Sequence, residues 1–203
     1  MPLKIGNTQV LNYILNYGGK HTLTNYKVNN MAVWSSVTPD EYFKFTLLED
    51  DTYAVGAADV TNMPDYVVFP STHNGKAVTK IDDMALIYIA PDLSYAVGCE
   101  AVKTIVIPDS ITTIGEYAFS GCINLSSINI PNSVVYIGQR AFFNCPSLTT
   151  IVIPISVTDI GYYAFGSCSK LTIYCEVSSL PSGWYTANQW NPDNCPVVWG
   201  YTG

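Results

Sequence analysis

Apolar and polar residues alternate in a pattern that occurs three times between residues 102 and 171. Each copy begins with a short stretch of alternating aliphatic residues that ends at a proline. A second extended stretch, a glycine and an A-F-x-x-C segment follow. The same landmarks recur every 23 residues, as at Phe119, Phe142 and Phe165. Alternation over a few residues predicts half-buried β-strands, and a fixed period predicts coils that bury their apolar faces by stacking on their neighbours.

The stretch that ends at Pro154 shows how the strand of one coil should be oriented. Ile151 and Ile153 should point into the interior, whereas Thr150 and Val152 should face outward, because successive side chains of a strand alternate between its two faces. Pro154 has no N–H group to donate to a neighbouring strand, so it should end the strand. Strands of successive coils should then stack in parallel.

The second half of each repeat predicts a turn. We expect its glycine, Gly138 in the middle copy, to adopt a backbone geometry closed to other residues. The A-F-x-x-C segment should form a single helical turn with its phenylalanine in the interior. An imperfect fourth copy begins near residue 66, with Asp82 in place of the glycine, and Asp is one of the few residues that visit left-handed conformations. Four coils exceed the about three that a stable stack needs.

From about Tyr66 to Ile173 these motifs resemble the BspA-like (treponemal-type) leucine-rich-repeat family, whose repeat reads IPxSVTxIGxxAFxxCxxLTxI. The resemblance implies an α/β, β-rich fold: a right-handed leucine-rich-repeat solenoid of about four 23-residue repeats with short helical turns. It also implies a scaffold for binding or display, since the family has no shared catalytic residues. Family members resemble secreted, surface or phage-borne proteins of host-associated bacteria and protists, and several are linked to adhesion.

The flanking segments predict two domains. Residues 1–37 hold the pattern K-[IV]-x-N-x-x-V twice and should form a small β-hairpin segment. This segment is either an attachment module, similar to N-terminal segments of prophage-encoded structural proteins, or an extension packed on the solenoid. Residues 38–203 should form the leucine-rich-repeat domain. We expect an N-terminal cap with a hairpin at 38–65, repeats at 66–173 and a Trp-rich C-terminal cap at 174–203.

Six cysteines would suggest disulfides in an exported protein. Cys99 and three repeat cysteines occupy one column of the predicted stack, where the Cβ vectors of successive coils run parallel at about 4.8 Å. A disulfide prefers a Cβ separation of about 3.8 Å, so a column of free thiols is expected. The sequence leaves open whether a disulfide joins Cys175 and Cys195. We predict no metal site, because the cysteine spacing follows the repeat and His21 and His73 lie far away in sequence.

Charge and motif content exclude several function classes. The chain has 9 Lys and Arg residues against 16 Asp and Glu residues, a net charge of -7, which argues against nucleic-acid partners. No apolar run approaches the about 20 residues of a membrane span, and the first 19 residues show no secretory signal, so no membrane insertion is expected. With two histidines and no nucleophile, phosphate-binding or metalloprotease motif, we predict neither catalytic residues nor a cofactor.

Candidate binding residues lie on surfaces that vary between repeats. The insert at 87–98 makes this copy ten residues longer than the others, and such excursions often lie on the binding side of repeat proteins. Tyrosines at variable positions predict either an interaction surface or filling of grooves between coils. The Trp-rich end predicts either a cap or a site where sugars stack. The partner-binding candidates are Thr104, Ser127 and Thr150; Val106, Asn129 and Val152; Tyr117, Tyr136, Tyr162 and Tyr163; and Tyr88 and Tyr95 of the insert. The sugar-stacking candidates are Trp184 and Trp190.

Three functions fit these features of the sequence. The first is a non-catalytic protein-interaction or adhesion module that presents the repeat surface to a protein or cell-surface partner. The second is a phage or prophage virion-associated display protein attached through residues 1–37. The third is a carbohydrate-binding protein that uses the Trp-rich region. All three predict an extracellular, cell-surface or virion-associated location.

Overall fold

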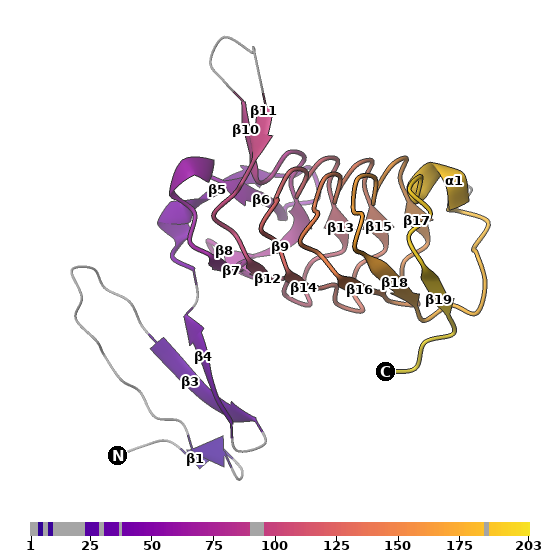
Figure 1. Cartoon of the computed structure of the whole chain (residues 1–203). Coiled ribbons are helices and arrows are strands. Elements are labelled where there is room, and N and C mark those ends of the chain that lie inside the picture. Colours follow the sequence, from indigo (N-terminus) through magenta and orange to yellow (C-terminus); the bar gives the residue numbers. More distant parts are fainter. Residues whose placement is uncertain are drawn as a thin grey trace.

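A computed structural model describes residues 4–5, 8–9, 23–28, 31–36, 38–89, 96–184 and 187–203. Beyond residue 38 the chain winds into an elongated stack of coils (Figure 1). One side of the stack holds six described strands in two parallel three-stranded sheets. They are β7 (Tyr66–Val68), β12 (Thr104–Val106) and β14 (Ser127–Asn129), then β16 (Thr150–Ile153), β18 (Thr172–Cys175) and β19 (Val197–Trp199).

A seven-stranded sheet forms another side of the stack. Its strands β6, β9, β13, β15 and β17 run parallel, and β5 pairs antiparallel with β6 at the N-terminal edge. The β5–β6 hairpin therefore covers the first coil, as predicted, and protects a sheet edge. The bounds are β5 (Phe43–Leu47), β6 (Tyr53–Ala57), β9 (Lys76–Ile81), β13 (Thr113–Ile114), β15 (Tyr136–Ile137) and β17 (Asp159–Ile160).

Shorter elements complete the described chain. Two 3₁₀ helices precede the repeats, β8 pairs antiparallel with β9, and β10 and β11 form a separate hairpin. No described helix is long and apolar enough to cross a membrane. The bounds are η1 (Asp40–Tyr42), η2 (Val60–Asn62), β8 (Thr72–His73), β10 (Ile87–Ile89), β11 (Ala96–Gly98) and α1 (Ala187–Trp190).

Two antiparallel strand pairs lie in the N-terminal segment. β1 (Lys4–Ile5) pairs with β2 (Thr8–Gln9), and β3 (Leu23–Val28) pairs with β4 (Met31–Ser36). Each pair includes residues of one copy of the K-[IV]-x-N-x-x-V pattern, and β3 and β4 extend beyond it on both sides. The division of the chain at residue 37 and its role stay predictions.

The core is one continuous row of aromatic rings along the axis of the stack. Phe119, Phe142 and Phe165 are fully buried, with ring centroids 5.4 Å and 5.3 Å apart in succession. Phe69 extends the row by 6.1 Å at one end, and Trp190 by 5.8 Å at the other. Such aromatic contacts add about 0.5–1.5 kcal/mol per pair beyond the burial of apolar area. The shared row confirms that the repeats form a single solenoid.

The A-F-x-x-C segments form turns and not the helical turns that we predicted. The N–H of Ser120 donates to the carbonyl of Tyr117 at 3.1 Å, which closes a turn within the coil. The N–H groups of Tyr117 and Phe119 instead donate across to Gln139 and Ala141 of the next coil, each at 2.8 Å. A helix would use these N–H groups internally, so the third side of the stack gains its cohesion from bonds between coils.

The repeat glycine is required for a different reason from the one predicted. Gly138 does not have a positive φ angle, but a Cβ atom on it would lie 2.5 Å from the carbonyl carbon of Gly115. Close approach of successive coils therefore excludes a side chain. Asp82 does not adopt a left-handed conformation either. Its carboxylate accepts a hydrogen bond from Thr46 at 3.5 Å and lies 3.7 Å from Lys80 Nζ.

The segment predicted as a C-terminal cap forms a further coil. The carbonyls of Gln189 and Trp190 accept hydrogen bonds from Tyr163 and Phe165, as the corresponding residues do in earlier coils. β19 then continues the sheet of β16 and β18. The described residues therefore form about six coils, where the repeat pattern predicted four and a cap.

All six cysteines are free and buried. They include Cys175 and Cys195, for which the sequence left a disulfide undecided. Cys195 extends the cysteine column, because its thiol donates to the carbonyl of Cys168 at 3.3 Å. Cys168 and Cys145 donate in the same way to Phe142 and Phe119, at 3.0 Å and 3.2 Å. The cysteines act as small buried side chains that link successive coils.

Candidate interaction site

The β10–β11 hairpin projects from the otherwise regular stack (Figure 1). It lies between Leu86 and Cys99, both buried, which occupy the core positions of their coil. The N–H of Cys99 donates to the carbonyl of Leu86 at 2.9 Å, so the chain leaves the coil and returns to it at one point. Tyr88 of β10 pairs with Val97 of β11. The insert therefore stands on a closed coil and does not interrupt the core.

Gly98 fixes the angle at which the hairpin meets the stack. A Cβ atom on this residue would lie 2.1 Å from the carbonyl oxygen of Ser120 and 2.2 Å from the carbonyl carbon of Gly121. These are backbone atoms that cannot rotate away. The return strand therefore rests directly on the turn of the next coil, and the base of the hairpin is held rigidly.

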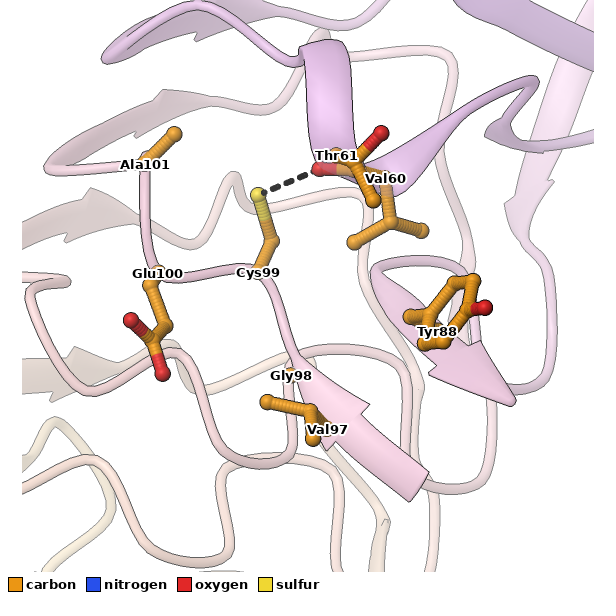
Figure 2. A pocket seen from close by; sticks show the side chains of 8 residues that line it. All are labelled: Val60, Thr61, Tyr88, Val97, Gly98, Cys99, Glu100 and Ala101. Atoms are coloured by element: carbon orange, nitrogen blue, oxygen red, sulfur yellow. Dashed lines mark hydrogen bonds between the residues drawn. The ribbon is translucent and has the colours of Figure 1, made fainter. Parts of the chain in front are cut away.

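A cleft of about 420 Å³ lies on the side of the hairpin that faces η2, and we call it the η2 cleft. Figure 2 shows Tyr88 and Val97 of the hairpin on one side of it and Val60 on another. The wall is largely apolar, and the exposed carboxylate of Glu100 is the charged group in it. The remaining lining residues are Thr61, Gly98, Cys99 and Ala101.

Cys99 forms an inert part of this wall. Its thiol is buried and donates to the carbonyl of Val60 at 3.3 Å (Figure 2). Burial raises the pKa of the Cys99 thiol above its ordinary value. Since the thiolate is the reactive form, Cys99 is not suited to act as a nucleophile or a metal ligand at neutral pH.

A second cleft, of about 570 Å³, borders the hairpin base and the turns of the next two coils, and we call it the Arg140 cleft. Ile87, Val97 and Ile123 give it apolar walls, whereas Glu100 and Arg140 give it charge. The other lining residues are Gly98, Tyr117, Ser120, Gly121, Phe143 and Asn144.

Aromatic rings hold Arg140 in place. Its Cζ atom lies 5.5 Å from the ring centre of Tyr117, 5.7 Å from that of Tyr163 and 5.8 Å from that of Phe143. Its Nη1 donates to the hydroxyl of Tyr117. Tyr117, Arg140 and Tyr163 occupy the same position in successive coils, each with φ between 52° and 57°. The side chains at this position therefore stack in a column along one side of the solenoid.

The structure brings only some of the predicted binding residues to these clefts. Tyr88 lines the η2 cleft and Tyr117 the Arg140 cleft, whereas Tyr95 lies outside the described residues. Tyr163 contacts Arg140, and its ring lies 4.3 Å from that of Tyr162. The other candidates lie elsewhere, with exposed or half-buried side chains on the outer faces of the sheets. They are Thr104, Val106, Ser127 and Asn129 on the β7–β12–β14 sheet, Thr150 and Val152 on the β16–β18–β19 sheet, and Tyr136 on the seven-stranded sheet.

Most lining residues of the clefts were not named individually from the sequence, among them Val97, Glu100 and Arg140, although Val97 lies in the insert at 87–98 that we singled out. For Arg140 a signal was present, because it occupies the repeat position of Tyr117 and Tyr163, both of which we singled out. For Val97 the signal was the length of the insert, whereas for Glu100, which follows the insert, no signal was present. Their place depends on how the hairpin folds back onto the next coil.

The sequence left open whether the Trp-rich end is a cap or a sugar-stacking site, and the burial of Trp184 and Trp190 favours the cap. Trp190 is fully buried and Trp184 is 5% exposed, with ring centroids 5.5 Å apart. The indole Nε1 of Trp184 donates to the carbonyl of Val157 at 3.1 Å. Neither ring offers a face to a ligand, so both residues close the C-terminal end of the core.

No group of three or more His, Cys, Asp or Glu side chains among the described residues is arranged to hold a metal ion. Only His73 of the two histidines is described, and its Nδ1 lies 3.3 Å from Asp40, with its ring stacked on Phe45 at 3.7 Å. The side chains that line the two clefts can bind a partner by apolar contact, hydrogen bonds and charge.

Residues 94–183 match the family model for the BspA type leucine rich repeat region, in six copies. The match covers somewhat less than half of the chain, and the repeats of this region are similar to the BspA type. The match confirms the predicted resemblance to this family and the fold class. It begins within the hairpin insert and ends at Gly183, so the BspA-type repeats include one wall of each cleft.

Solved structures of bacterial leucine-rich-repeat proteins are similar to this chain. The Treponema pallidum leucine-rich-repeat protein is 28% identical with a TM-score of 0.61, over 74% of this chain and 63% of its own. A Bacteroides capillosus leucine-rich-repeat protein is 26% identical with a TM-score of 0.55, over 70% of this chain and 99% of its own.

A leucine-rich cell surface protein of Faecalibacterium prausnitzii, 22% identical with a TM-score of 0.59, shares the fold over 79% of this chain and 38% of its own. The chain therefore spans less than two thirds of the length of the Treponema and Faecalibacterium proteins. A comparison with curated proteins found no match.

Proposed function

We propose that this protein is a non-catalytic protein-binding module, and that it contacts its partner through the β10–β11 hairpin and the two clefts beside it. Similarity to the BspA-type repeats supports a scaffold for protein interaction. Recruitment of the module to a cell surface, where it would act in adhesion, is the setting in which we expect this interaction.

The observation that carries the proposal is the hairpin itself. The insert creates two clefts of about 420 and 570 Å³ that share Val97, Gly98 and Glu100. Apolar side chains of the hairpin are exposed at this site. Val97, which lines both clefts, is 39% exposed, and Ile89 of β10 is 42% exposed. Exposed apolar groups beside a rigid cleft are typical of protein-binding surfaces.

Selection from a random peptide display library against the full chain tests this proposal. We expect enriched peptides to bind the wild-type chain and to lose at least tenfold in affinity for a Val97→Asp variant. Val198→Asp is a matched control, because Val198 is also a strand valine, with 41% exposure, at the opposite end of the stack. Tyr88→Ala serves as a second variant, and thermal unfolding establishes that each variant folds.

Peptides that bind Val97→Asp and Tyr88→Ala as tightly as the wild type would overturn the proposed site. Failure to enrich any peptide would also count against it, since two open clefts with apolar walls should capture short apolar segments.

A further inference from the structure

Arg140 is the only arginine in the chain, and it lies at the Arg140 cleft with its charge unneutralised. Among the described residues no carboxylate oxygen lies within 4.0 Å of its guanidinium, although the net charge of the chain is -7. By contrast, Lys76, Lys80 and Lys103 each form an ion pair with an aspartate. The described lysines without an ion pair, Lys44 and Lys170, are exposed, so among the half-buried cations with described side chains Arg140 alone lacks a carboxylate partner.

The surroundings of Arg140 orient its guanidinium without using up its donors. The rings of Tyr117, Tyr163 and Phe143 surround it, and one Nη atom donates to the Tyr117 hydroxyl. Gln139 Nε2 reaches the same hydroxyl at 3.4 Å. Guanidinium has five N–H donors in a rigid fork that matches a carboxylate. Aromatic contacts fix such a group in advance, which lowers the entropy cost of binding.

The other groups of the cleft define what can accompany a carboxylate. Ile123 and Val97 provide apolar surface within the same 570 Å³. Glu100 also lines the cleft without pairing with Arg140, and it would repel a second negative charge. The cleft therefore favours a single carboxylate next to an apolar group over a polyanion.

We infer that the Arg140 cleft binds an aspartate or glutamate side chain of the protein partner, with a neighbouring apolar residue of that partner against Ile123 and Val97. This inference rests on the proposed function and specifies the chemistry of the partner. Paired bonds from a guanidinium fork to a carboxylate are short and about twice as strong as neutral hydrogen bonds, so this contact gives the interaction its selectivity.

The single arginine makes a direct test possible, because the full chain labelled with ¹⁵N has one arginine Nε–Hε resonance. We propose titration with acetyl-Leu-Glu-amide at pH 6, with acetyl-Leu-Gln-amide as the matched neutral probe. The Glu peptide should shift the Arg140 resonance saturably, with an affinity at least tenfold higher than that of the Gln peptide. Raising the salt concentration should weaken the binding of the Glu peptide only.

Variants of Arg140 distinguish recognition of the carboxylate by the guanidinium from simple packing of the side chain. Arg140→Lys retains the charge but loses the fork, and Arg140→Gln loses both, so binding of the Glu peptide, followed on backbone amide resonances of 120–123, should weaken in that order. Equal binding of the Glu and Gln peptides, or no saturable shift, would overturn this inference. Library peptides that need Val97 but show no acidic residue would overturn it as well, while leaving the proposed function intact.

Discussion

At the scale of single residues, the buried cysteines show how the fold suppresses thiol chemistry. Burial raises the pKa of Cys122 and of Cys175 to about 12 and that of Cys195 to about 11. An unfolded thiol has a pKa of about 8.5, so the unfolded chain loses these protons first. Above that pH the unfolded state binds fewer protons than the folded state, and the free energy of unfolding must fall as pH rises.

We therefore predict that the contribution of these three thiols to stability is constant below about pH 8.5 and declines from there toward pH 11, by up to about 1.4 kcal/mol per pH unit for each of Cys122, Cys175 and Cys195. Urea unfolding between pH 7.5 and 10.5 in reducing buffer measures this. The free energy of unfolding of a Cys175→Ala variant should fall less steeply with pH, because this variant lacks the contribution of one buried thiol. Tyrosines and lysines titrate in both proteins and cancel, so identical slopes would refute the assignment.

Residue-level predictions from the sequence succeeded where the side-chain period decided the outcome. Alternation placed Ile151 and Ile153 inside and Thr150 outside, as the structure has them. The reasons given for Gly138 and Asp82 were wrong, because both depend on the distance between coils. A repeat period does not reveal that distance, and glycine serves both close approach and positive φ.

At the scale of elements, the last coil shows why a degenerate repeat is difficult to recognise. Between the second and third repeats, Cys145 precedes the start of β16 at Thr150 by five residues, whereas Cys195 precedes the start of β19 at Val197 by two. The shortened connection removes the leucine landmark. The ring of Trp190 packs on Phe165 and continues the row of buried aromatic rings. Of the repeat landmarks, only the cysteine can still be recognised in the sequence of this coil.

Asn191 holds this shortened coil together. It is 4% exposed, and its amide both accepts from the N–H of Cys195 at 3.0 Å and donates to the Cys195 carbonyl at 2.8 Å. We predict that Asn191→Ala lowers the free energy of unfolding by about 2–4 kcal/mol, since two buried backbone groups lose their partner. Asn132→Ala, at an exposed position, is the control and should change stability by less than about 0.5 kcal/mol.

Urea unfolding of the two asparagine variants makes the comparison. Equal stabilities would mean that the segment after α1 is not an integral coil of the solenoid. The β10–β11 hairpin, by contrast, was anticipated as an element from the length of the insert. Its clefts were not, because they depend on Gly98 resting against Ser120.

At the scale of the whole molecule, a continuous core supports a surface that differs sharply along its length. Coils that follow the repeat present small side chains such as Ser127 and Thr150 on a flat sheet. The coil with the insert, together with the turns of the next two coils, instead presents apolar walls, an acidic group and the single arginine. The similarity to BspA-type repeats and the fold could be predicted from the repeats, whereas the candidate site arises where the chain departs from them.

Hydrogen–deuterium exchange of the full chain, with and without the tightest library peptide, tests the proposed site most directly. We predict slower exchange at 87–89, 96–101 and 117–123, the segments that form the hairpin base and both clefts. Protection confined to the flat sheet at 104–106, 127–129 and 150–153, with exchange at the hairpin unchanged, would contradict the proposed site.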